Sequence, residues 1–391
     1  MDFKDWLEEI SSDKFTVFVK RLSANDTGLT GSNQVGSYIP KTTLGDAFPS
    51  FRSWKGTPKA YIQALIESHG MPEKEVAATF YESKNEGRLT SWVKGVGNSP
   101  MQDAENTGAL TVFAFELNGE EDCETVKVWI CKNLEEEEYF EKVAGNVDPD
   151  THLSVKGHEL FQHMPNDAEN SSYELPESWK SEFPAGKEII SFLYEQPLTK
   201  DESPDKRIVK FREYELALFM EIEKAHVFPK IQRGFDNVDD FVALANSVLN
   251  RRKSRSGKSL ELHLEIIFQE EGLNNFGTQC VTEGRKKPDF LFPSCQAYHD
   301  DDYPQDKLRM LAVKTTLKDR WRQVLNEADK ISDIYLFTLQ KGVSKAQFDE
   351  MVSERVKLVV PDELHKSYPQ EIRNNLISLK AFISDIKSLY V

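Results

Sequence analysis

The sequence predicts a two-domain protein of the α+β and α/β classes, and three observations support this fold class. The chain has 391 residues, which is more than one domain usually holds. Residues 164–172 are polar and lack hydrophobic periodicity, as in a linker. The spacing of apolar residues also differs on the two sides of this segment. We therefore expect a first domain at residues 1–163, a linker at 164–175 and a second domain at 176–391.

The first domain is predicted to be mostly β. Apolar runs suited to strands occur at residues 15–22, 110–117 and 126–131, separated by loops rich in Gly, Asn, Asp and Ser. The loops at 24–28 and 104–108 resemble each other weakly, with the sequences ANDTG and AENTG. This similarity fits two related arms of a barrel and fits chance equally well.

The second domain is predicted to alternate helices and strands. Apolar residues recur at helical spacing in residues 259–270, which predicts a helix there. The remaining predicted elements are strands at 275–282, 288–292 and 308–315, a helix at 316–330, and strands at 333–340 and 356–360. This order predicts a mixed sheet with helices on both faces.

Composition and cysteine usage favour a globular protein of the cytoplasm. Hydrophobic residues make up 39% and charged residues 29%, a globular composition without a run long enough to span a bilayer. The acidic N-terminus lacks the pattern of a signal peptide. The four cysteines form no CxxC pair, so we expect neither a zinc ribbon nor a disulfide framework. We expect free thiols that are mostly buried.

Basic residues concentrate in one stretch of a chain whose net charge is −16. DNA responds to local fields rather than to the total charge, because screening removes distant charges within about 10 Å. Basic groups occur at 251–258, 285–287 and 318–322. A solvated surface explains any one of these groups, but it does not explain all three in one stretch. The first group supplies our candidates for binding target DNA: Arg252, Lys253, Arg255 and Lys258.

Four charged residues of the second domain form a candidate phosphodiester-cutting site. Such chemistry needs carboxylates that hold Mg²⁺ and a lysine near the scissile phosphate. Asp289 and Lys314 both lie in apolar strand signals, where an unpaired charge is costly to bury. Either residue alone is more often structural, but two opposite charges on neighbouring strands favour a catalytic role. Glu327 on the following predicted helix and Glu261 on the earlier one can supply further carboxylates.

These residues carry a resemblance to the PD-(D/E)xK nucleases. Pro288 and Asp289, followed about two dozen residues later by Val313 and Lys314, resemble that motif. The acid usually found two residues before the lysine is replaced by Ala312. A subset of restriction enzymes carries this acid on the following helix, and Glu327 fits that arrangement.

A closer resemblance, to the EcoRII family of type IIE restriction endonucleases, covers nearly the whole chain. Its most specific segments are NRRKSR at 250–255, GKSLE at 257–261, KPDFLFP at 287–293, LAVKTT at 311–316, KDRWR at 318–322 and NEADK at 326–330. In the first domain, LSANDTG at 22–28 and ENTGAL at 105–110 also match. The chain is identified as a member of this family.

The resemblance implies a specific activity and specific partners. By this resemblance, the chain is expected to form a homodimer through its C-terminal domain and to use Mg²⁺ to cleave double-stranded DNA before CCWGG. The N-terminal domain resembles a plant B3 pseudobarrel, binds a second copy of the site as effector, and blocks the catalytic cleft until it does so. A DNA methyltransferase is expected in the same system.

The resemblance also implies roles for individual residues. The catalytic residues are Asp289, Lys314, Glu327 and Glu261, with Asp289 and Glu327 as metal ligands. Lys318, Asp319 and Arg320 match the positions that read C:G pairs, which suits the hydrogen-bonding groups of these bases. The effector-contacting residues are Tyr38, Lys84, Glu86 and Arg88. Gly87 stands where a cation is expected, and Asn33 stands where a histidine is usual, so effector affinity or specificity is expected to differ.

Two alternatives remain open at this point. A DNA-binding regulator that no longer cuts is disfavoured by the intact set of carboxylates and lysine. A nuclease without allosteric control differs only in the function of its first domain. Deleting the first domain distinguishes a nuclease without allosteric control from an autoinhibited enzyme.

Overall fold

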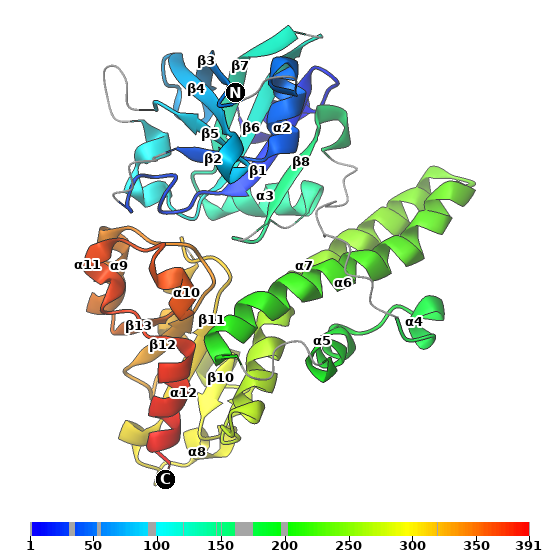
Figure 1. The fold of residues 1–391 in the computed structure, drawn as a ribbon. Coiled ribbons are helices and arrows are strands. Elements are labelled where there is room, and N and C mark those ends of the chain that lie inside the picture. Colours follow the sequence, from blue (N-terminus) through cyan, green and yellow to red (C-terminus); the bar gives the residue numbers. More distant parts are fainter. Residues whose placement is uncertain are drawn as a thin grey trace.

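Two separate sheets organise the molecule (Figure 1). The computed structural model describes residues 2–30, 36–52, 56–92, 99–119, 121–145, 147–149, 151–160, 175–196, 202–318 and 320–390, without the side chains of Lys253 and Ser256. Residues 161–174, which include most of the predicted linker, lie outside these ranges, as do Asn33 and Asp319. Among the described residues, no helix is both long enough and apolar enough to cross a membrane.

The N-terminal part is a curved, eight-stranded sheet with the order β2-β5-β4-β3-β7-β6-β1-β8. Its strands are β1 (Phe15–Arg21), β2 (Ser37–Ile39), β3 (Lys59–Ile66), β4 (Lys74–Tyr81), β5 (Glu86–Thr90), β6 (Leu110–Asn118), β7 (Glu121–Ile130) and β8 (His152–Lys156). All pairs are antiparallel except β3–β7. The prediction of a mostly β region is confirmed, and the strand predictions match β1, β6 and β7.

Both faces of this sheet are buried along β1 and most of β6, whereas β3 leaves one face exposed. Successive side chains of a strand point to opposite faces. Accordingly, Phe18 belongs to one hydrophobic cluster, while Val17 and Val19 belong to another. The helices of this part are α1 (Phe3–Ile10), α2 (Lys41–Ala47) and α3 (Leu134–Ala144). Trp6 of α1 and Phe140 of α3 pack on the Val17 face, and Leu44 of α2 packs on the Phe18 face.

The C-terminal part is a five-stranded mixed sheet with the order β13-β12-β11-β10-β9. Its strands are β9 (Gly277–Thr278), β10 (Phe290–Phe292), β11 (Arg309–Val313), β12 (Ile334–Phe337) and β13 (Val356–Val359). Strands β11, β12 and β13 are parallel, whereas β10 runs antiparallel to both of its neighbours. The prediction of a mixed sheet is therefore confirmed.

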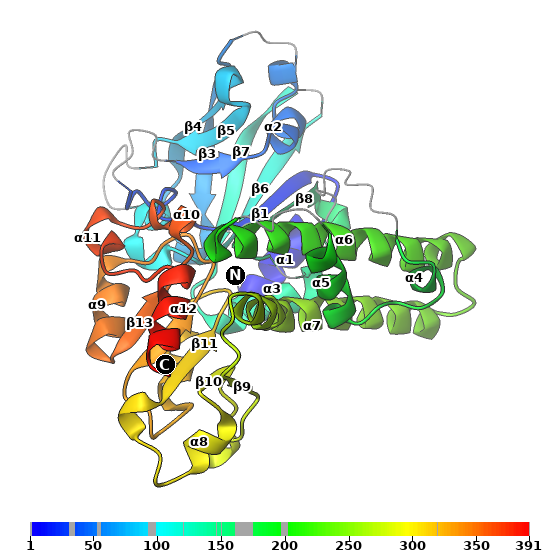
Figure 2. The ribbon, with the colours of Figure 1, turned by 60° about the horizontal axis from the view of Figure 1, so that its bottom comes forward.

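Helices surround this second sheet (Figures 1 and 2). They are α4 (Ser178–Ser181), α5 (Gly186–Glu195), α6 (Pro204–Arg233), α7 (Val238–Glu270), α8 (Cys295–His299), α9 (Lys345–Ser353), α10 (Asp362–His365), α11 (Gln370–Arg373) and α12 (Leu379–Ser388). Phe268 of α7 and Phe382 of α12 contact Phe292 of β10. The predicted helix at 259–270 is thus the last third of the much longer α7, which forms a long hairpin with α6.

Two predicted elements differ in the structure. The predicted strand at 275–282 shrinks to β9, because Gln279 takes a left-handed conformation with φ of 55°. The predicted α-helix at 316–330 is replaced by a 3-10 helix, η9 (Trp321–Asn326). Its backbone bonds join residues three apart, as from Glu327 N–H to the Val324 carbonyl. The side chain of Gln340 also captures the N–H of Leu317, so the segment starts as a turn.

The prediction of four free thiols is wrong for one pair. Cys280 and Cys295 form a disulfide, with Cα atoms 5.5 Å apart. Cys280 follows β9 by two residues and Cys295 is the first residue of α8, and their spacing in the sequence does not show that the fold brings them together. Cys123 and Cys131 are free and buried, as expected.

Candidate active site and DNA-facing surfaces

Asp289 and Lys314 meet where β10 begins and β11 ends. The antiparallel register places Phe290 opposite Leu311, so the residue before β10 lies beside the end of β11. The Val313 N–H donates to Asp289 Oδ2 over 2.7 Å and orients that carboxylate. The Lys314 ammonium lies 3.8 Å from the same oxygen. The structure therefore brings the first two predicted catalytic residues together.

Glu327 reaches the same point from the end of η9. Its Oε1 lies 3.7 Å from Lys314 Nζ. Its Oε2 is buried and accepts no hydrogen bond from the described residues. The backbone that carries it is held by Thr282, whose hydroxyl donates to the Glu327 carbonyl, and by Lys286, whose ammonium donates to the Asn326 carbonyl. Sequence reasoning missed these two supports, because both act on backbone oxygens that no residue pattern reveals.

Glu261 approaches this group from α7. Lys258, one turn earlier, lies 2.9 Å from Glu261 Oε2, and the Gln279 amide donates to the same oxygen over 3.3 Å. Asp289 and Lys314 both exert an electrostatic effect on Glu261, so it belongs to their neighbourhood. Gln279 was also missed from the sequence, because its left-handed backbone is what turns it toward Glu261.

Burial dominates the electrostatics of the three carboxylates. It raises the pKa of Asp289, of Glu327 and of Glu261 above their ordinary values, although the Lys314 ammonium opposes the rise in each case. Desolvated carboxylates of this kind gain most from a further positive charge. The nearby lysines therefore do not fully offset the burial of these three carboxylates, and a bound metal cation would stabilise their charged forms.

The donor set of the cluster suits Mg²⁺. Carboxylate oxygens are hard ligands, and this ion usually binds one or two of them and keeps several waters. The unpaired Glu327 Oε2 is the donor that such an ion needs. Within the described ranges, no three Asp, Glu, His or Cys side chains already stand in the arrangement of an ion site. Asp289 and Glu327 therefore fit an ion completed by water.

Comparison with known proteins decides the family. The EcoRII N-terminal family pattern matches residues 11–159, and the EcoRII C-terminal pattern matches residues 219–383. The Type II restriction enzyme EcoRII of Escherichia coli is 47% identical over 401 residues, covering 99% of this chain and 98% of that enzyme. The chain belongs to the EcoRII family of type II restriction endonucleases.

Two more distant similarities accompany this one. The Type II restriction enzyme SsoII of Shigella sonnei is 24% identical over 225 residues, covering 54% of this chain and 65% of that enzyme. A structure of metal-depleted Ecl18kI in complex with uncleaved DNA is 19% identical, with a TM-score of 0.45, over 54% of this chain and 80% of that chain. Membership of the EcoRII family confirms the predicted family, the two-part fold class and the prediction of a DNA-binding, site-specific deoxyribonuclease.

Two basic residues of α7, Arg252 and Arg255, lie deeper than a surface patch, whereas Lys258 is exposed. Arg252 is buried, and its Nε donates to Glu223 over 2.9 Å. Arg255 is paired with Glu215 at 2.9 Å. The side chain of Lys253, which belongs to the same set of predicted contacts with target DNA, lies outside the described residues.

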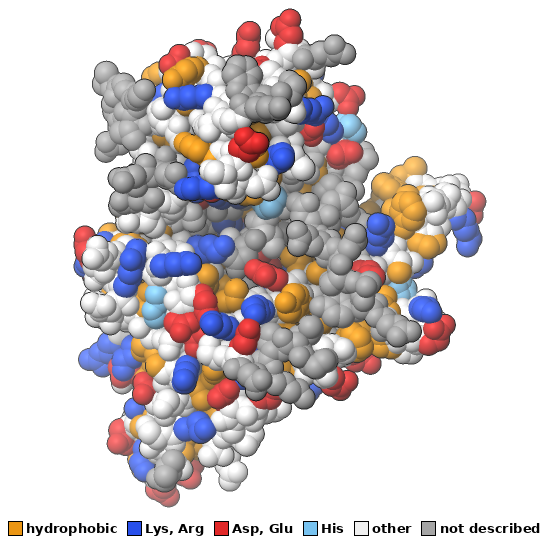
Figure 3. Space-filling view, viewed as in Figure 1, with side chains coloured by type: hydrophobic (Ala, Val, Ile, Leu, Met, Phe, Trp, Pro, Cys, Tyr) orange, Lys and Arg blue, Asp and Glu red, His pale blue; other side chains and the backbone are white. Residues whose placement is uncertain are grey.

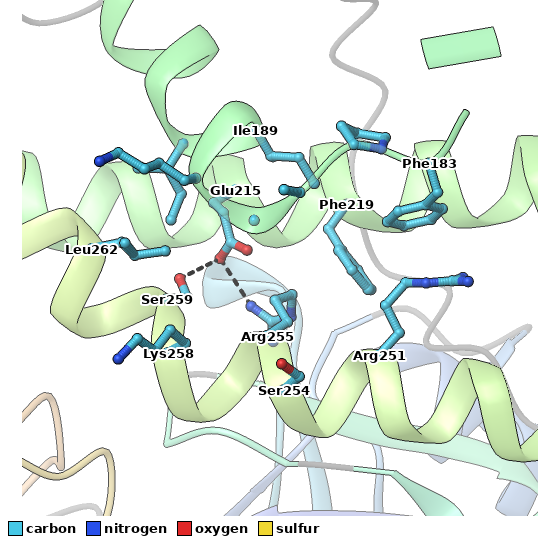
Figure 4. Close-up of a pocket in the computed structure, with 15 residues that line it drawn as sticks. Phe183, Ile189, Glu215, Phe219, Arg251, Ser254, Arg255, Lys258, Ser259 and Leu262 are labelled. Atoms are coloured by element: carbon cyan, nitrogen blue, oxygen red, sulfur yellow. Dashed lines mark hydrogen bonds and ion pairs between the residues drawn. The ribbon is translucent and has the colours of Figure 1, made fainter. Parts of the chain in front are cut away.

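Arg255 and Lys258 also line a cavity of about 520 Å³ between α7, α6 and the start of α5 (Figure 4). Figure 4 shows Glu215 on the opposite wall, bonded to Arg255 and Ser259. Arg251 stands farther along the same side of α7, with its guanidinium 4.0 Å above the ring of Phe183. The basic segment thus forms one cation-rich wall of a cavity.

Lys318 and Arg320 are held by the N-terminal part of the EcoRII-family chain. The Lys318 ammonium donates to the Cys131 carbonyl over 2.5 Å, and Arg320 lies 3.5 Å from Glu141 of α3. Asp319, between them, is not among the described residues. Lys318 and Arg320, two of the residues predicted to read C:G pairs, are therefore engaged within the chain.

The interface between the two parts continues through Asp148. This carboxylate follows α3 and lies 2.9 Å from Arg212 of α6 and 3.4 Å from Arg255 of α7. Glu215 binds the same two arginines, at 2.8 and 2.9 Å. Asp148 from the N-terminal part and Glu215 from the C-terminal part thus bind the same two guanidinium groups.

The two loops with similar sequences belong to this interface as well. Thr27 and Thr107 of these loops join through their hydroxyls at 2.8 Å. The Ala24 N–H donates to the Lys341 carbonyl over 3.0 Å. Gly108, with φ of 88°, approaches Gln340 so closely that a Cβ would lie 2.7 Å from its amide. The loops therefore pair with each other and bear on the C-terminal part.

The predicted effector contacts gather at the β2–β5 edge of the first sheet. Tyr38 of β2 faces Arg88 of β5 in the register, and Arg88 pairs with Glu86. Lys84 is exposed just before β5. At Gly87, where a cation was expected, a Cβ atom would point toward the core and lie 2.2 Å from the side chain of Leu44. A side chain at this position has no room and would not face DNA.

Proposed function

We propose that this chain is a Mg²⁺-dependent endonuclease that cuts double-stranded DNA before the first cytosine of CCWGG-type sites. Asp289, Lys314 and Glu327 are its catalytic residues, with Glu261 as a fourth catalytic carboxylate. The observation that carries this assignment is the position of the Lys314 ammonium, 3.8 Å from Asp289 and 3.7 Å from Glu327. The target sequence is the one that the family resemblance implies.

Each residue has a role that follows from its place. A bound Mg²⁺ would neutralise charge on the scissile phosphate and lower the pKa of a bound water. Asp289 and Glu327 would hold the ion, one fixed by the Val313 N–H and the other offering an unpaired oxygen. Lys314 would donate to a phosphoryl oxygen and stabilise the charge that develops during attack. Glu261, oriented by Lys258, would position a water at the same point.

The contacts of Lys318 and Arg320 support autoinhibition by the N-terminal part. Bases can be read only by side chains that are free to enter the major groove. These two cations are bound by Cys131 and Glu141 instead. We propose residues 1–163 as the effector-binding domain, 164–175 as the linker and 176–391 as the catalytic domain. Effector DNA at the β2–β5 edge, through Tyr38, Lys84, Glu86 and Arg88, would weaken this contact.

Target DNA would also be held by the basic segment of α7. The proposed contacts are Arg252, Lys253, Arg255 and Lys258, together with Lys318, Asp319 and Arg320. Arg252 and Arg255 are paired with carboxylates in this structure, so they can contribute only after those pairs rearrange. Of these pairs, the Arg255–Asp148 contact joins the two parts, so release of the N-terminal part would remove one partner of Arg255, while Glu223 and Glu215 would still have to give way to phosphate.

The proposed assembly is a homodimer through the C-terminal part. One chain carries one catalytic cluster, whereas a duplex has two strands of opposite direction, so two copies related by a twofold axis suit double-strand cleavage. The proposed setting is the bacterial cytoplasm, with a DNA methyltransferase that protects the same sites on host DNA.

The test is digestion of DNA carrying several CCWGG sites by the full-length protein with Mg²⁺, followed by sequencing of the fragment ends. Ends that begin with CCWGG are expected. Asp289→Asn should abolish fragments while retaining DNA binding, and the surface variant Asp333→Asn, on a residue paired with Lys357, should cut normally. Bound but uncut DNA with the unaltered protein would instead establish a non-cleaving regulator.

A further inference from the structure

The far end of the α6–α7 hairpin carries a concentration of exposed apolar side chains. We call residues 228–242 the hairpin tip; every residue in it is exposed. Six of the nine exposed large hydrophobic residues among the described residues lie here: Phe228, Ile231, Phe235, Val238, Phe241 and Val242. Val238 is 74% exposed. Soluble proteins rarely leave such a group uncovered, so the tip has the character of an interface.

The tip stands away from both sheets. Figures 1 and 2 show the hairpin projecting beyond the rest of the molecule, and Figure 3 shows apolar side chains gathered on its end. Phe235 and Phe241 pack edge to face across the turn, with ring centroids 5.4 Å apart. This pair fixes the turn, and the outer surfaces of both rings remain exposed.

Charges of both signs surround the apolar group. The last turn of α6 contributes Lys230 and Arg233, and the first turn of α7 contributes Asp239 and Asp240. With Asp236 of the turn, the tip carries two cations and three anions around its apolar centre, so charges of both signs are available for contact with a second copy. In a twofold contact, the cations of one copy can face the anions of the other.

We propose that the hairpin tip is the place where a second copy of this chain docks, so that both tips are buried across a twofold axis. This inference rests on the proposed function, which requires two catalytic clusters for the two strands of DNA. DNA itself does not suit the tip, because its aspartates would repel phosphates and its apolar side chains would remain wet. An apolar centre with a charged rim is the usual make-up of a stable interface between proteins.

The experiment measures the dissociation constant of the full-length dimer by sedimentation, in the unaltered protein and in Phe241→Asp. Because Phe241 is 51% exposed, the fold should persist, which far-UV circular dichroism checks. The matched control is Val352→Asp on α9, which is 54% exposed and away from the tip. We expect the dissociation constant to rise at least about a hundredfold for Phe241→Asp, since burying an unpaired carboxylate is costly. The control should dimerise normally.

A second variant keeps the inference testable if Phe241→Asp fails to fold. The charge reversal Asp239→Lys with Asp240→Lys leaves the apolar residues in place, and it should weaken the dimer at low salt more than at high salt. Normal dimerisation of folded Phe241→Asp would overturn the inference while the homodimer itself stands. An unaltered protein that stays monomeric yet cuts both strands would refute the homodimer and this surface together. Normal dimerisation with lost DNA binding would assign the tip to DNA and overturn the inference.

Discussion

The catalytic cluster and the basic residues beside it differ in how their charges are satisfied. In the cluster, one ammonium serves two carboxylates at 3.7 and 3.8 Å, and Glu327 Oε2 has no partner among the described residues. Among the basic residues, Arg252, Arg255, Lys258, Lys318 and Arg320 each contact a carboxylate or carbonyl at 3.5 Å or less. The proposed cutting site therefore has its carboxylates and ammonium already together, whereas the groups proposed to bind DNA are paired within the chain.

This difference separates the groups proposed to cut DNA from the groups proposed to bind it. The cluster needs only an ion and a phosphate to complete it. The basic residues must first exchange partners inside the chain, such as Glu141 and Asp148, for phosphates and bases. The proposed autoinhibition would then depend on the stability of the contact between the two parts, and each change below acts on one side of this comparison.

Removing the ammonium should have the largest effect. Lys314→Ala deletes the ammonium that both Asp289 and Glu327 contact, and we expect cleavage to slow about a thousandfold or more. DNA binding should persist, because Lys314 lies in the cluster and not among the basic groups. Single-turnover digestion measures the rate, with Lys357→Ala as control on an exposed lysine of β13. Cleavage within tenfold of the unaltered rate would remove Lys314 from the catalytic set.

The support of the cluster is tested through the disulfide. Cys280 lies between Gln279, which contacts Glu261, and the segment whose Thr282 holds Glu327. Cys280→Ser with Cys295→Ser opens a cross-link between residues 15 apart, for which the loss of unfolding free energy is about 3 kcal/mol. The midpoint of thermal unfolding should fall and become insensitive to reductant.

Cys123→Ser provides the comparison for this measurement. Cys123 is a buried free thiol, so that variant should keep the response to reductant of the unaltered protein. Equal unfolding midpoints for the unaltered protein and the double variant, both without reductant, would show that the pair is not linked in solution.

The other side of the comparison is tested at Asp148. Asp148→Asn removes the carboxylate with which the N-terminal part binds Arg212 and Arg255. A hydrogen bond to a charged group contributes about 1.5–3 kcal/mol, but Glu215 retains both arginines, so we expect cleavage of single-site DNA to rise only about tenfold. Asp122→Asn, on a residue that bonds Ser50 away from the interface, is the control. An unchanged rate on single-site DNA would mean that this contact does not restrain the enzyme.

The sequence predicted which charged side chains come together better than it predicted the elements that carry them. Asp289 and Lys314 stood out because charge in an apolar strand is costly, and the β10–β11 register brings them together. Glu327 was predicted on an α-helix, yet it follows a 3-10 helix and lies 3.7 Å from the Lys314 ammonium. Residue type and order carry this information, whereas the choice between helical forms depends on a distant partner such as Gln340.

Contacts between the two parts could not be derived from local patterns. The loops at 24–28 and 104–108 showed their similarity in sequence, but not that Thr27 and Thr107 bond each other and lie against the C-terminal part. The basic run at 251–258 looked like a surface patch, because an acid that neutralises it, Asp148, lies about a hundred residues away in the chain. Pairings across such distances follow from the tertiary fold alone.

The smallest expected effect concerns His263, on the buried face of α7 that lies between the cluster and the paired arginines. Burial, reinforced by Arg212 and Arg255, lowers the pKa of this imidazole well below its ordinary value. The unfolded chain therefore takes up a proton below about pH 6.5 that the folded chain does not. This contribution to stability is fully present above that pH and is lost as the pH falls toward the depressed folded value, by up to about 1.4 kcal/mol per pH unit. His263→Gln should flatten the decline of the unfolding free energy between pH 6.5 and 5.5, whereas His299→Gln, on an exposed histidine, should not. Identical pH profiles for His263→Gln and the unaltered protein would contradict this prediction. They would mean that burial and the two nearby arginines do not keep His263 unprotonated in the folded protein.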